Sequence, residues 1–266
     1  MSGPRLLFST AAFFARPLDD SFRLIAECGY TGVEVLVTND PASQDAESMR
    51  AAAERHGLWI GALHDPSLVL TRWVWGTDRV GKIERAVDVA AGAGIPLVVT
   101  HPPYRWQRQT RAWFRDELPR LEERSGIVVG IENMFPLLHV GFHPLMLHAS
   151  QDLDELEGID HLVLDTSHAA VARHDLIDVR RRFGDRLRHI HLSDNAGKGF
   201  DSHLPPGEGV LALDPFLDDL VRSGYEGTIS IEVDLRRFLT EARRLRALME
   251  EMREKVEARL DGAAAG

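Results

Sequence analysis

Two kinds of segment alternate along nearly the whole chain, and this alternation constrains the fold more than any other feature. Short β-branched or apolar runs are followed by longer amphipathic stretches, which is typical of a parallel sheet whose strands are joined by crossover helices. The runs that predict strands span residues 6–9, 32–37, 59–63, 97–100, 128–131, 162–164, 189–192 and 228–233. We therefore expect an α/β protein built on eight strands.

The segments between these runs carry the apolar periodicity of helices. They span residues 21–27, 45–56, 78–93, 110–123, 175–183, 214–223 and 236–260. In the last segment Leu245, Met249 and Met252 recur at helical spacing, so one face of a long helix should dock on the protein. Gly57 and Gly94 each follow a helical segment and precede a strand, where a left-handed C-cap is expected.

Eight strands with their helices in 266 residues match the size of one (β/α)8 barrel. We predict a single TIM barrel over residues 1–266, with 261–266 as a frayed tail. A doubly wound open sheet is the alternative, but no G-x-G-x-x-G motif follows the first strand. The apolar segment 6–15 resembles part of a signal peptide, but a strand followed by a loop explains the same residues.

Charge and cysteine content exclude several classes of protein. Lys and Arg number 31 against 41 Asp and Glu, and the net charge of −10 argues against a nucleic-acid partner unless a local basic patch overrides it. No run approaches the roughly 18 apolar residues of a membrane span. Cys28 is the only cysteine, which excludes an intramolecular disulfide and a cysteine-based zinc site. We expect a cytoplasmic protein that binds any metal through histidine and carboxylate groups.

Residues of the types that ligate metals lie at the ends of six consecutive predicted strands. They are His64, His101, Glu132, Asp165, His191 and Glu232, joined by His168 beyond the sixth strand and by Asp201 and His203 in the loop after the seventh. The carboxyl ends of all strands in a barrel converge on one mouth, where imidazole and carboxylate groups hold divalent cations. A single residue of this kind is more often a hydrogen-bonding loop residue, so their joint occurrence is what predicts a metal site.

The remaining histidines have no such placement. They are His56, His139, His143, His148, His161, His174 and His189, which we interpret as surface, capping or supporting residues. His189 shares a strand face with His191, which leaves a supporting role open to it, and Asn133 is a candidate to orient a ligand or the substrate. Glu34 lies within the second strand, so it is a candidate to point into the barrel and pair there.

Aromatic residues cluster in the loops that would surround the mouth. They are Trp73 and Trp75 after the third strand, Tyr104 and Trp106 after the fourth, and Phe135 and Phe142 after the fifth. Flat apolar rings beside polar groups suit stacking on a sugar, so Trp73, Trp75, Tyr104 and Trp106 are candidates for substrate binding. Alternatively, they cap the barrel or form a contact between the subunits of a homo-oligomer.

Several short stretches are specific enough to carry a resemblance. They are Ile131-Glu132-Asn133, Leu164-Asp165-Thr166-Ser167-His168-Ala169, His189-Ile190-His191-Leu192-Ser193-Asp194, Asp201-Ser202-His203 and Gly207-Glu208-Gly209. From Gly29 to Val233 the chain resembles the xylose-isomerase-like TIM-barrel superfamily. That superfamily contains sugar and sugar-phosphate isomerases and epimerases, and also apurinic-site nucleases of the endonuclease-IV type.

The resemblance implies roles for particular residues. It makes Glu132, Asp165, His191 and Glu232 the metal ligands shared across the superfamily, and it matches the further ligands of the three-metal nuclease branch to His64, His101, His168, Asp201 and His203. Two departures bear on the substrate. The nucleases insert an aromatic residue into the duplex, and the matching residue here is Ser67. The epimerases place an arginine a few residues after the seventh-strand histidine, and that region of this chain contains Gly197 and Lys198 instead. Lys198 is therefore a candidate for substrate binding.

We therefore expect a divalent-metal-dependent isomerase or epimerase of a small sugar or sugar phosphate, holding one to three ions of Mn, Zn, Mg or Co. Glu132 and Glu232 would be base and acid in proton transfer through an ene-diolate, and His168 would hydrogen-bond a substrate oxygen. One alternative is an apurinic-site endonuclease, in which clustered ions activate water. Another is a catalytically silent ligand-binding barrel. No G-x-S-x-G, P-loop or H-E-x-x-H motif indicates other chemistry.

Overall fold

The computed structural model describes residues 3–67, 71, 73–136, 138–140, 143–149 and 152–264. Within them, parallel strands close into a barrel in the order β1-β10-β9-β8-β5-β4-β3-β2. The strands are β1 Arg5–Ser9, β2 Gly32–Leu36, β3 Trp59–His64, β4 Leu97–Thr100, β5 Val128–Glu132, β8 Leu162–Asp165, β9 Leu187–Leu192 and β10 Thr228–Ile231. The predicted TIM barrel is confirmed, and the open sheet is wrong, because β1 pairs with both β2 and β10.

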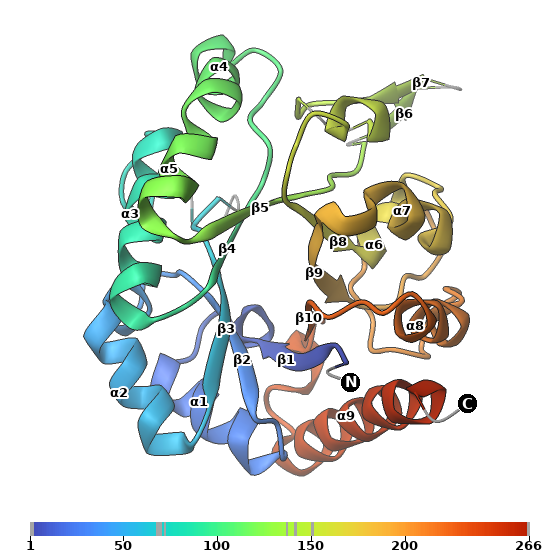
Figure 1. The fold of residues 1–266 in the computed structure, drawn as a ribbon. Coiled ribbons are helices and arrows are strands. Elements are labelled where there is room, and N and C mark those ends of the chain that lie inside the picture. The colour runs from blue at the N-terminus through green and yellow to red at the C-terminus, as the bar shows by residue number, and fades with distance from the viewer. Residues whose placement is uncertain are drawn as a thin grey trace.

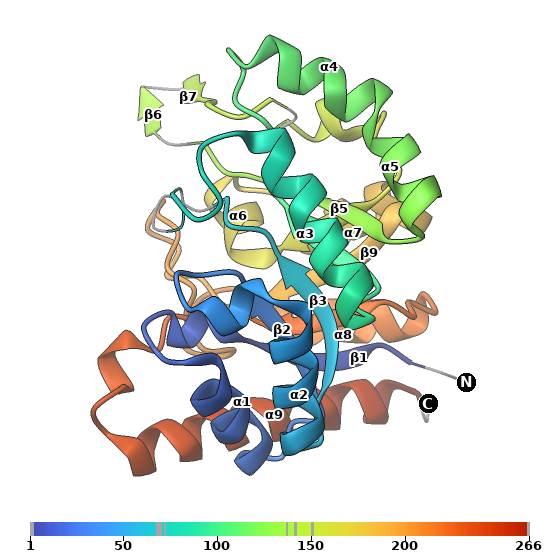
Figure 2. The same cartoon turned by 90° about the vertical axis from the view of Figure 1, so that its left-hand side faces the viewer.

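Helices surround this barrel (Figure 1). They are α1 Leu18–Glu27, α2 Ala46–His56, α3 Arg79–Ala93, α4 Arg108–Asp116, α5 Leu118–Ser125, α6 Thr166–Val171, α7 Leu176–Phe183, α8 Leu213–Arg222 and α9 Ala242–Ala264. Helices α1, α2 and α3 lie side by side on one flank (Figure 2). Gly57 and Gly94 are left-handed caps as predicted, with φ of 66° and 71°. Among the described residues no helix combines the length and apolar character needed to cross a bilayer.

The structure differs from the predicted elements in several places, α6 being a further helix that was not predicted. The helix predicted over 110–123 is two helices, because Pro119, the second residue of α5, has no N–H with which to continue the hydrogen bonding of α4. The last helix begins at Ala242 rather than at residue 236, since Arg236–Phe238 form a separate 3-10 turn (η6), and it continues to Ala264, with Ala265 and Gly266 outside the described residues. The connection from β5 to β8 contains a hairpin, β6 Leu138–Val140 with β7 His143–Leu145, that was not predicted.

Alternation along the strands separates the apolar core from the site. Outward residues such as Phe8, Val98 and Ile190 pack in one large cluster with the helices. A smaller cluster of strand residues on the opposite face fills part of the barrel interior: Leu7, Ala62, Leu97, Val99 and Val163. Because successive strand residues face opposite sides, the neighbours of the outward residues point inward, and at the carboxyl ends of the strands these neighbours are polar. The fold thus places histidine and carboxylate side chains above an apolar interior.

Candidate metal centre

The carboxyl ends of the strands open into a cavity of about 550 Å3. One part of its wall is polar and consists of His64, His101, Glu132, His168, Asp201, His203 and Glu232. The other part is mainly apolar and includes Ala11, Ala12, Phe14, Met134, Leu147, Val233 and Leu239. The cavity therefore combines a ligand-rich floor with a surface suited to a carbon skeleton.

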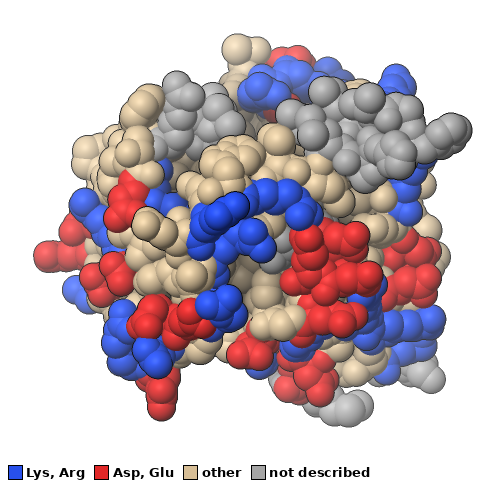
Figure 3. All heavy atoms as spheres, turned by 90° about the horizontal axis from the view of Figure 1, so that it is seen from above, with Lys and Arg blue, Asp and Glu red and all other residues tan. Residues whose placement is uncertain are grey.

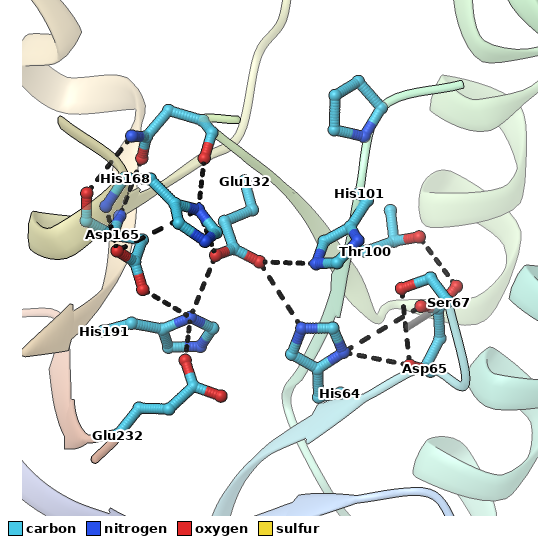
Figure 4. A network of polar contacts seen from close by, with 12 residues as sticks. His64, Asp65, Ser67, Thr100, His101, Glu132, Asp165, His168, His191 and Glu232 are labelled. Atoms are coloured by element: carbon cyan, nitrogen blue, oxygen red, sulfur yellow. Dashed lines mark hydrogen bonds and ion pairs between the residues drawn. The ribbon is translucent and has the colours of Figure 1, made fainter. Parts of the chain in front are cut away.

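Four of the predicted ligands meet next to this cavity: Glu132 and Glu232 line it, and Asp165 and His191 are fully buried beside them. Glu132, Asp165, His191 and Glu232 each offer one ligand atom, and these atoms all lie within 4.8 Å of one another. Nδ1 of His191 lies 2.9 Å from Glu232 Oε2, 3.4 Å from Glu132 Oε1 and 3.8 Å from Asp165 Oδ2 (Figure 4). Side chains from β5, β8, β9 and the end of β10 thus point toward one another around a shared centre.

Two further groups, made of predicted ligands alone, adjoin these four residues and share members with them. His64, His101 and Glu132 form one group, in which Glu132 Oε2 lies 3.4 Å from His64 Nε2 and 3.1 Å from His101 Nε2. Asp165, His168 and His203 form the other. Asp201 Oδ2 lies beside the second group, 2.8 Å from His203 Nε2 and 3.4 Å from His168 Nε2. The structure thus brings all nine predicted ligands into one connected cluster.

Local structure explains why Asp165 faces the cluster. It ends β8 and is the N-cap of α6, where Oδ1 accepts the backbone N–H of His168 at 2.6 Å. Its other oxygen, Oδ2, is buried and accepts no hydrogen bond from the described residues. The side chain of Asn133 fixes the same strand end, because it donates to the carbonyl of Asp165 and accepts its N–H at 3.1 and 2.7 Å. Asn133 therefore orients a ligand through the backbone.

Backbone carbonyls orient two of the histidines. Nδ1 of His64 donates to the carbonyl of Asp65 at 2.9 Å, and Nδ1 of His168 donates to the carbonyl of Asn133 at 2.8 Å. These bonds leave Nε2 of each ring directed at carboxylates of the cluster. A neutral imidazole held in this way presents one lone pair to a metal ion.

Burial and charge shift the pKa values of these groups in opposite directions. Burial alone would lower the pKa of His64, but its contact with Glu132 raises it to about 9. Burial raises the pKa of Asp165 to about 6, although His168 and His203 oppose the shift. Burial would raise the pKa of Glu132, but the positive histidines around it hold that pKa well below its usual range. Without a metal the cluster therefore pairs carboxylates with protonated histidines, except at His101, whose pKa burial lowers.

This donor set fits a divalent cation. The imidazole and carboxylate groups are the ligands that zinc and manganese take in proteins, and an oxygen as deeply buried as Asp165 Oδ2 needs a positive partner. Glu132, Asp165, His191 and Glu232 would hold such an ion.

Arg79 supports the cluster, and sequence analysis missed it. Its guanidinium donates to Asp65 Oδ2 at 3.0 Å and to both Thr100 Oγ1 and the carbonyl of His101 at 2.6 Å. Thr100 in turn donates to Asp65 at 2.7 Å, so the ends of β3 and β4 are tied together. Arg79 is the first residue of α3, and no motif marked it.

Most of the predicted substrate-binding residues do not lie at the cavity. Of these residues only Tyr104 lines the cavity, whereas Trp73, Trp75, Trp106 and Lys198 are not among its described lining residues; the aromatic loop residue Phe135 also lines it. Trp73 and Trp106 are 66% and 64% exposed. Trp75 packs against the core instead, because its indole N–H donates to Gln44 and Arg85 lies over its ring. Phe142 lies outside the described residues, as do the side chains of His139 and His143.

Several cavity residues were not expected from the sequence. His148 lies at the wall with Nδ1 2.8 Å from the carbonyl of Pro102 and its ring 4.5 Å from that of Tyr104. Ala11 and Phe14 come from the turn after β1, and Leu239 from the segment after β10. In the sequence these apolar residues look the same as core residues, so nothing there marked them as residues that line the cavity.

Basic and acidic side chains occur in neighbouring groups on the face that Figure 3 shows. Arg236 is the only Lys or Arg among the described residues that line the cavity, and it pairs with Asp234 at 2.5 Å. The described part of the mouth therefore offers little unpaired positive charge.

Comparison with known proteins identifies the class to which this fold and cluster belong. Residues 22–255 match the family model of the xylose isomerase-like TIM barrel, and the chain belongs to that family. An uncharacterized protein of Mycobacterium tuberculosis is 33% identical over 243 residues, which are 85% of this chain and 87% of the relative.

Two other similarities are informative. Fructoselysine 3-epimerase of Shigella flexneri is 24% identical over 245 residues, covering 82% of this chain and 85% of that enzyme. The crystal structure of IolI protein with a bound zinc atom superposes with a TM-score of 0.73 at 18% identity, covering 96% of this chain and 99% of that one. The second similarity shows the shared fold.

Proposed function

We propose that this protein is a divalent-metal-dependent isomerase or epimerase of a small sugar. The observation that carries the proposal is the convergence of Glu132, Asp165, His191 and Glu232, two of which, Glu132 and Glu232, line a cavity with an apolar wall. A relative is named fructoselysine 3-epimerase, and the crystal structure of a protein of the same fold contains a zinc atom, which supports both parts of the proposal.

Glu132 and Glu232 are the proton-transfer groups in this proposal. Both line the cavity, and both approach His191 from different strands of the barrel. One carboxylate removes the proton from the carbon next to the substrate carbonyl, and the other carboxyl group delivers a proton to that carbon or its neighbour. A bound divalent ion would stabilise the negative charge that develops on the substrate oxygens.

His168 is suited to hold a substrate oxygen. Burial opposes its protonation, but Asp165 and Asp201 raise the pKa of His168 well above its usual value. With Nδ1 donating to the carbonyl of Asn133, the protonated ring carries Nε2–H at the cavity wall, 3.4 Å from Asp201 Oδ2, and there it would donate to a substrate oxygen as well. This donor would stay in place while charge on the substrate changes.

The charge of the described cavity lining bears on whether the substrate sugar carries a phosphate group. A phosphate group is usually bound by arginine, lysine or a helix N-terminus, and Arg236, the one such cation of the described lining, is already paired. We therefore expect unphosphorylated sugars to bind better than their phosphates.

Solvent exchange tests the proposed reaction. The manganese-loaded protein is incubated in deuterated water with a panel of ketoses and their phosphates, and deuterium at the carbon next to the carbonyl is measured by NMR. We expect exchange that disappears with a chelator and falls at least about 100-fold in Glu132→Gln and Glu232→Gln, since general acid–base catalysis contributes that much. Asp219→Asn is the matched control, because Asp219 lies on α8 and forms an ion pair with Arg180 of α7, outside the site. Absence of exchange on every sugar contradicts the proposal.

A metal-dependent apurinic-site endonuclease is the second candidate, favoured by one observation. The two further groups, His64 with His101 and His168 with His203, extend the ligand set as a site of several ions requires. A duplex with one abasic site, offered with zinc or manganese at low salt, separates the candidates. Nicking together with three bound ions per chain would favour the nuclease, and an intact duplex removes it.

A further inference from the structure

We propose that Glu34 is a positioning residue that fixes the ring of His191, so that Nδ1 rather than Nε2 faces the metal ligands. This inference rests on the proposed metal site at Glu132, Asp165, His191 and Glu232. Nε2 of His191 lies 3.0 Å from Glu34 Oε1, while Nδ1 lies on the other side of the ring, 2.9 Å from Glu232. The side chain of Glu34 is fully buried within the barrel.

The contrast with the other histidines supports this role. His64 and His168 are held through Nδ1 by backbone carbonyls and present Nε2 to the cluster. His191 lies within β9, and its ring is held the other way round, with a carboxylate in place of a carbonyl. Because an ionised carboxylate accepts the N–H of a metal-bound imidazole more strongly than a carbonyl does, Glu34 also makes His191 a better electron donor to the ion.

A second polar contact, too long for a hydrogen bond, reaches Glu34 itself. Nε2 of His189 lies 3.6 Å from Glu34 Oε2, and Nδ1 of His189 lies 2.6 Å from Thr228 Oγ1. A chain of polar contacts therefore runs from β10 through β9 to β2 and back to the metal ligand. None of these three side chains is among the described residues that line the cavity, so their contact is with the ligand and not with substrate.

The strand pairing brings these residues together at irregular positions. The register between β2 and β3 shifts between Val33 and Glu34, and the register between β8 and β9 shifts where Val163 pairs with His189. Such bulges re-aim side chains next to functional sites. Glu34 and His189 are thus each the first residue of their strand to pair regularly after a bulge.

The substitution Glu34→Gln tests the inference because it keeps the volume of the side chain and removes its charge. Zinc affinity is measured by competition with a chromophoric chelator, with folding checked by circular dichroism. We expect the dissociation constant to rise about 10- to 100-fold, as for other residues that support metal ligands. Asp219→Asn is the matched control, since it also removes a carboxylate of low exposure but lies outside the site, and its zinc affinity should be unchanged.

A second measurement is made on the unaltered protein, and a variant serves only to assign the signal. In zinc-loaded protein labelled with 15N-histidine, the spectrum should show the proton of His191 on Nε2 and zinc on Nδ1, with assignment from the signal lost in His191→Asn. A proton on Nδ1 overturns the inference, as does an unchanged affinity in folded Glu34→Gln. An anomalous scattering peak among Glu34, His189 and His191, which could themselves hold an ion, also overturns it. If the unaltered protein binds no zinc, the proposed function itself fails.

Discussion

Replacing Glu232 by glutamine should weaken metal binding without unfolding the barrel. The side chain of Glu232 is 14% exposed and faces the cavity, so a glutamine of the same shape fits there. Its backbone N–H donates to the carbonyl of Leu192 at 3.2 Å, and this bond between strand ends does not depend on the side chain. The substitution therefore removes a ligand oxygen and its charge while leaving the strand pairing in place.

The size of the effect follows from the number of ligands. Four-ligand zinc sites bind with about 10–16 kcal/mol, so an equal share is about 2.5–4 kcal/mol for each ligand. At about 1.4 kcal/mol for each factor of ten, Glu232→Gln should raise the zinc dissociation constant roughly 100- to 1,000-fold. Competition with a chelator measures this change, and thermal unfolding of the metal-free proteins serves as the control for folding. A dissociation constant within threefold of the unaltered protein would refute the assignment of Glu232 as a ligand.

Three further predictions follow from the same structure. Burial opposes protonation of His191, but Glu232 and Glu34 raise its pKa well above the usual value, so His191 is protonated in the metal-free protein. Zinc must displace the Nδ1 proton, so zinc affinity should increase with pH. Calorimetry in two buffers at pH 7.5 should show proton release, and identical heats would count against this prediction. Burial raises the pKa of the Cys28 thiol to about 11, so Ellman's reagent should label it only after denaturation. Phe216 is fully buried in the core between barrel and helices, so Phe216→Ala should lower the free energy of unfolding by about 3–5 kcal/mol in urea titrations, and a loss below about 1 kcal/mol would contradict that packing.

The strand ends were predictable because two signals coincide there. Apolar runs identify strands through local composition, and a barrel makes their carboxyl ends converge whatever the spacing along the chain. For this reason Glu132, Asp165 and His191 could be placed together without any knowledge of tertiary contacts. The same reasoning correctly pointed Glu34 into the barrel, since alternation in β2 determines its side.

Contacts across the barrel could not be predicted in this way. Glu34 reaches His191 from β2 to β9, two strands that are not neighbours in the sheet, and neither bulge is visible in the sequence. Loop position alone placed Trp75 at the mouth, whereas its bond to Gln44 holds it against the core. Side-chain partners in loops depend on tertiary packing, which local patterns do not encode.

The position of bound metal tests the account most directly. Crystals grown with zinc or manganese can be measured at the absorption edge of the metal, which locates each ion by anomalous scattering. The account predicts a strong peak within ligand distance of Glu132, Asp165, His191 and Glu232, with His191 bound through Nδ1. A metal-saturated crystal with no peak among these four side chains would contradict it.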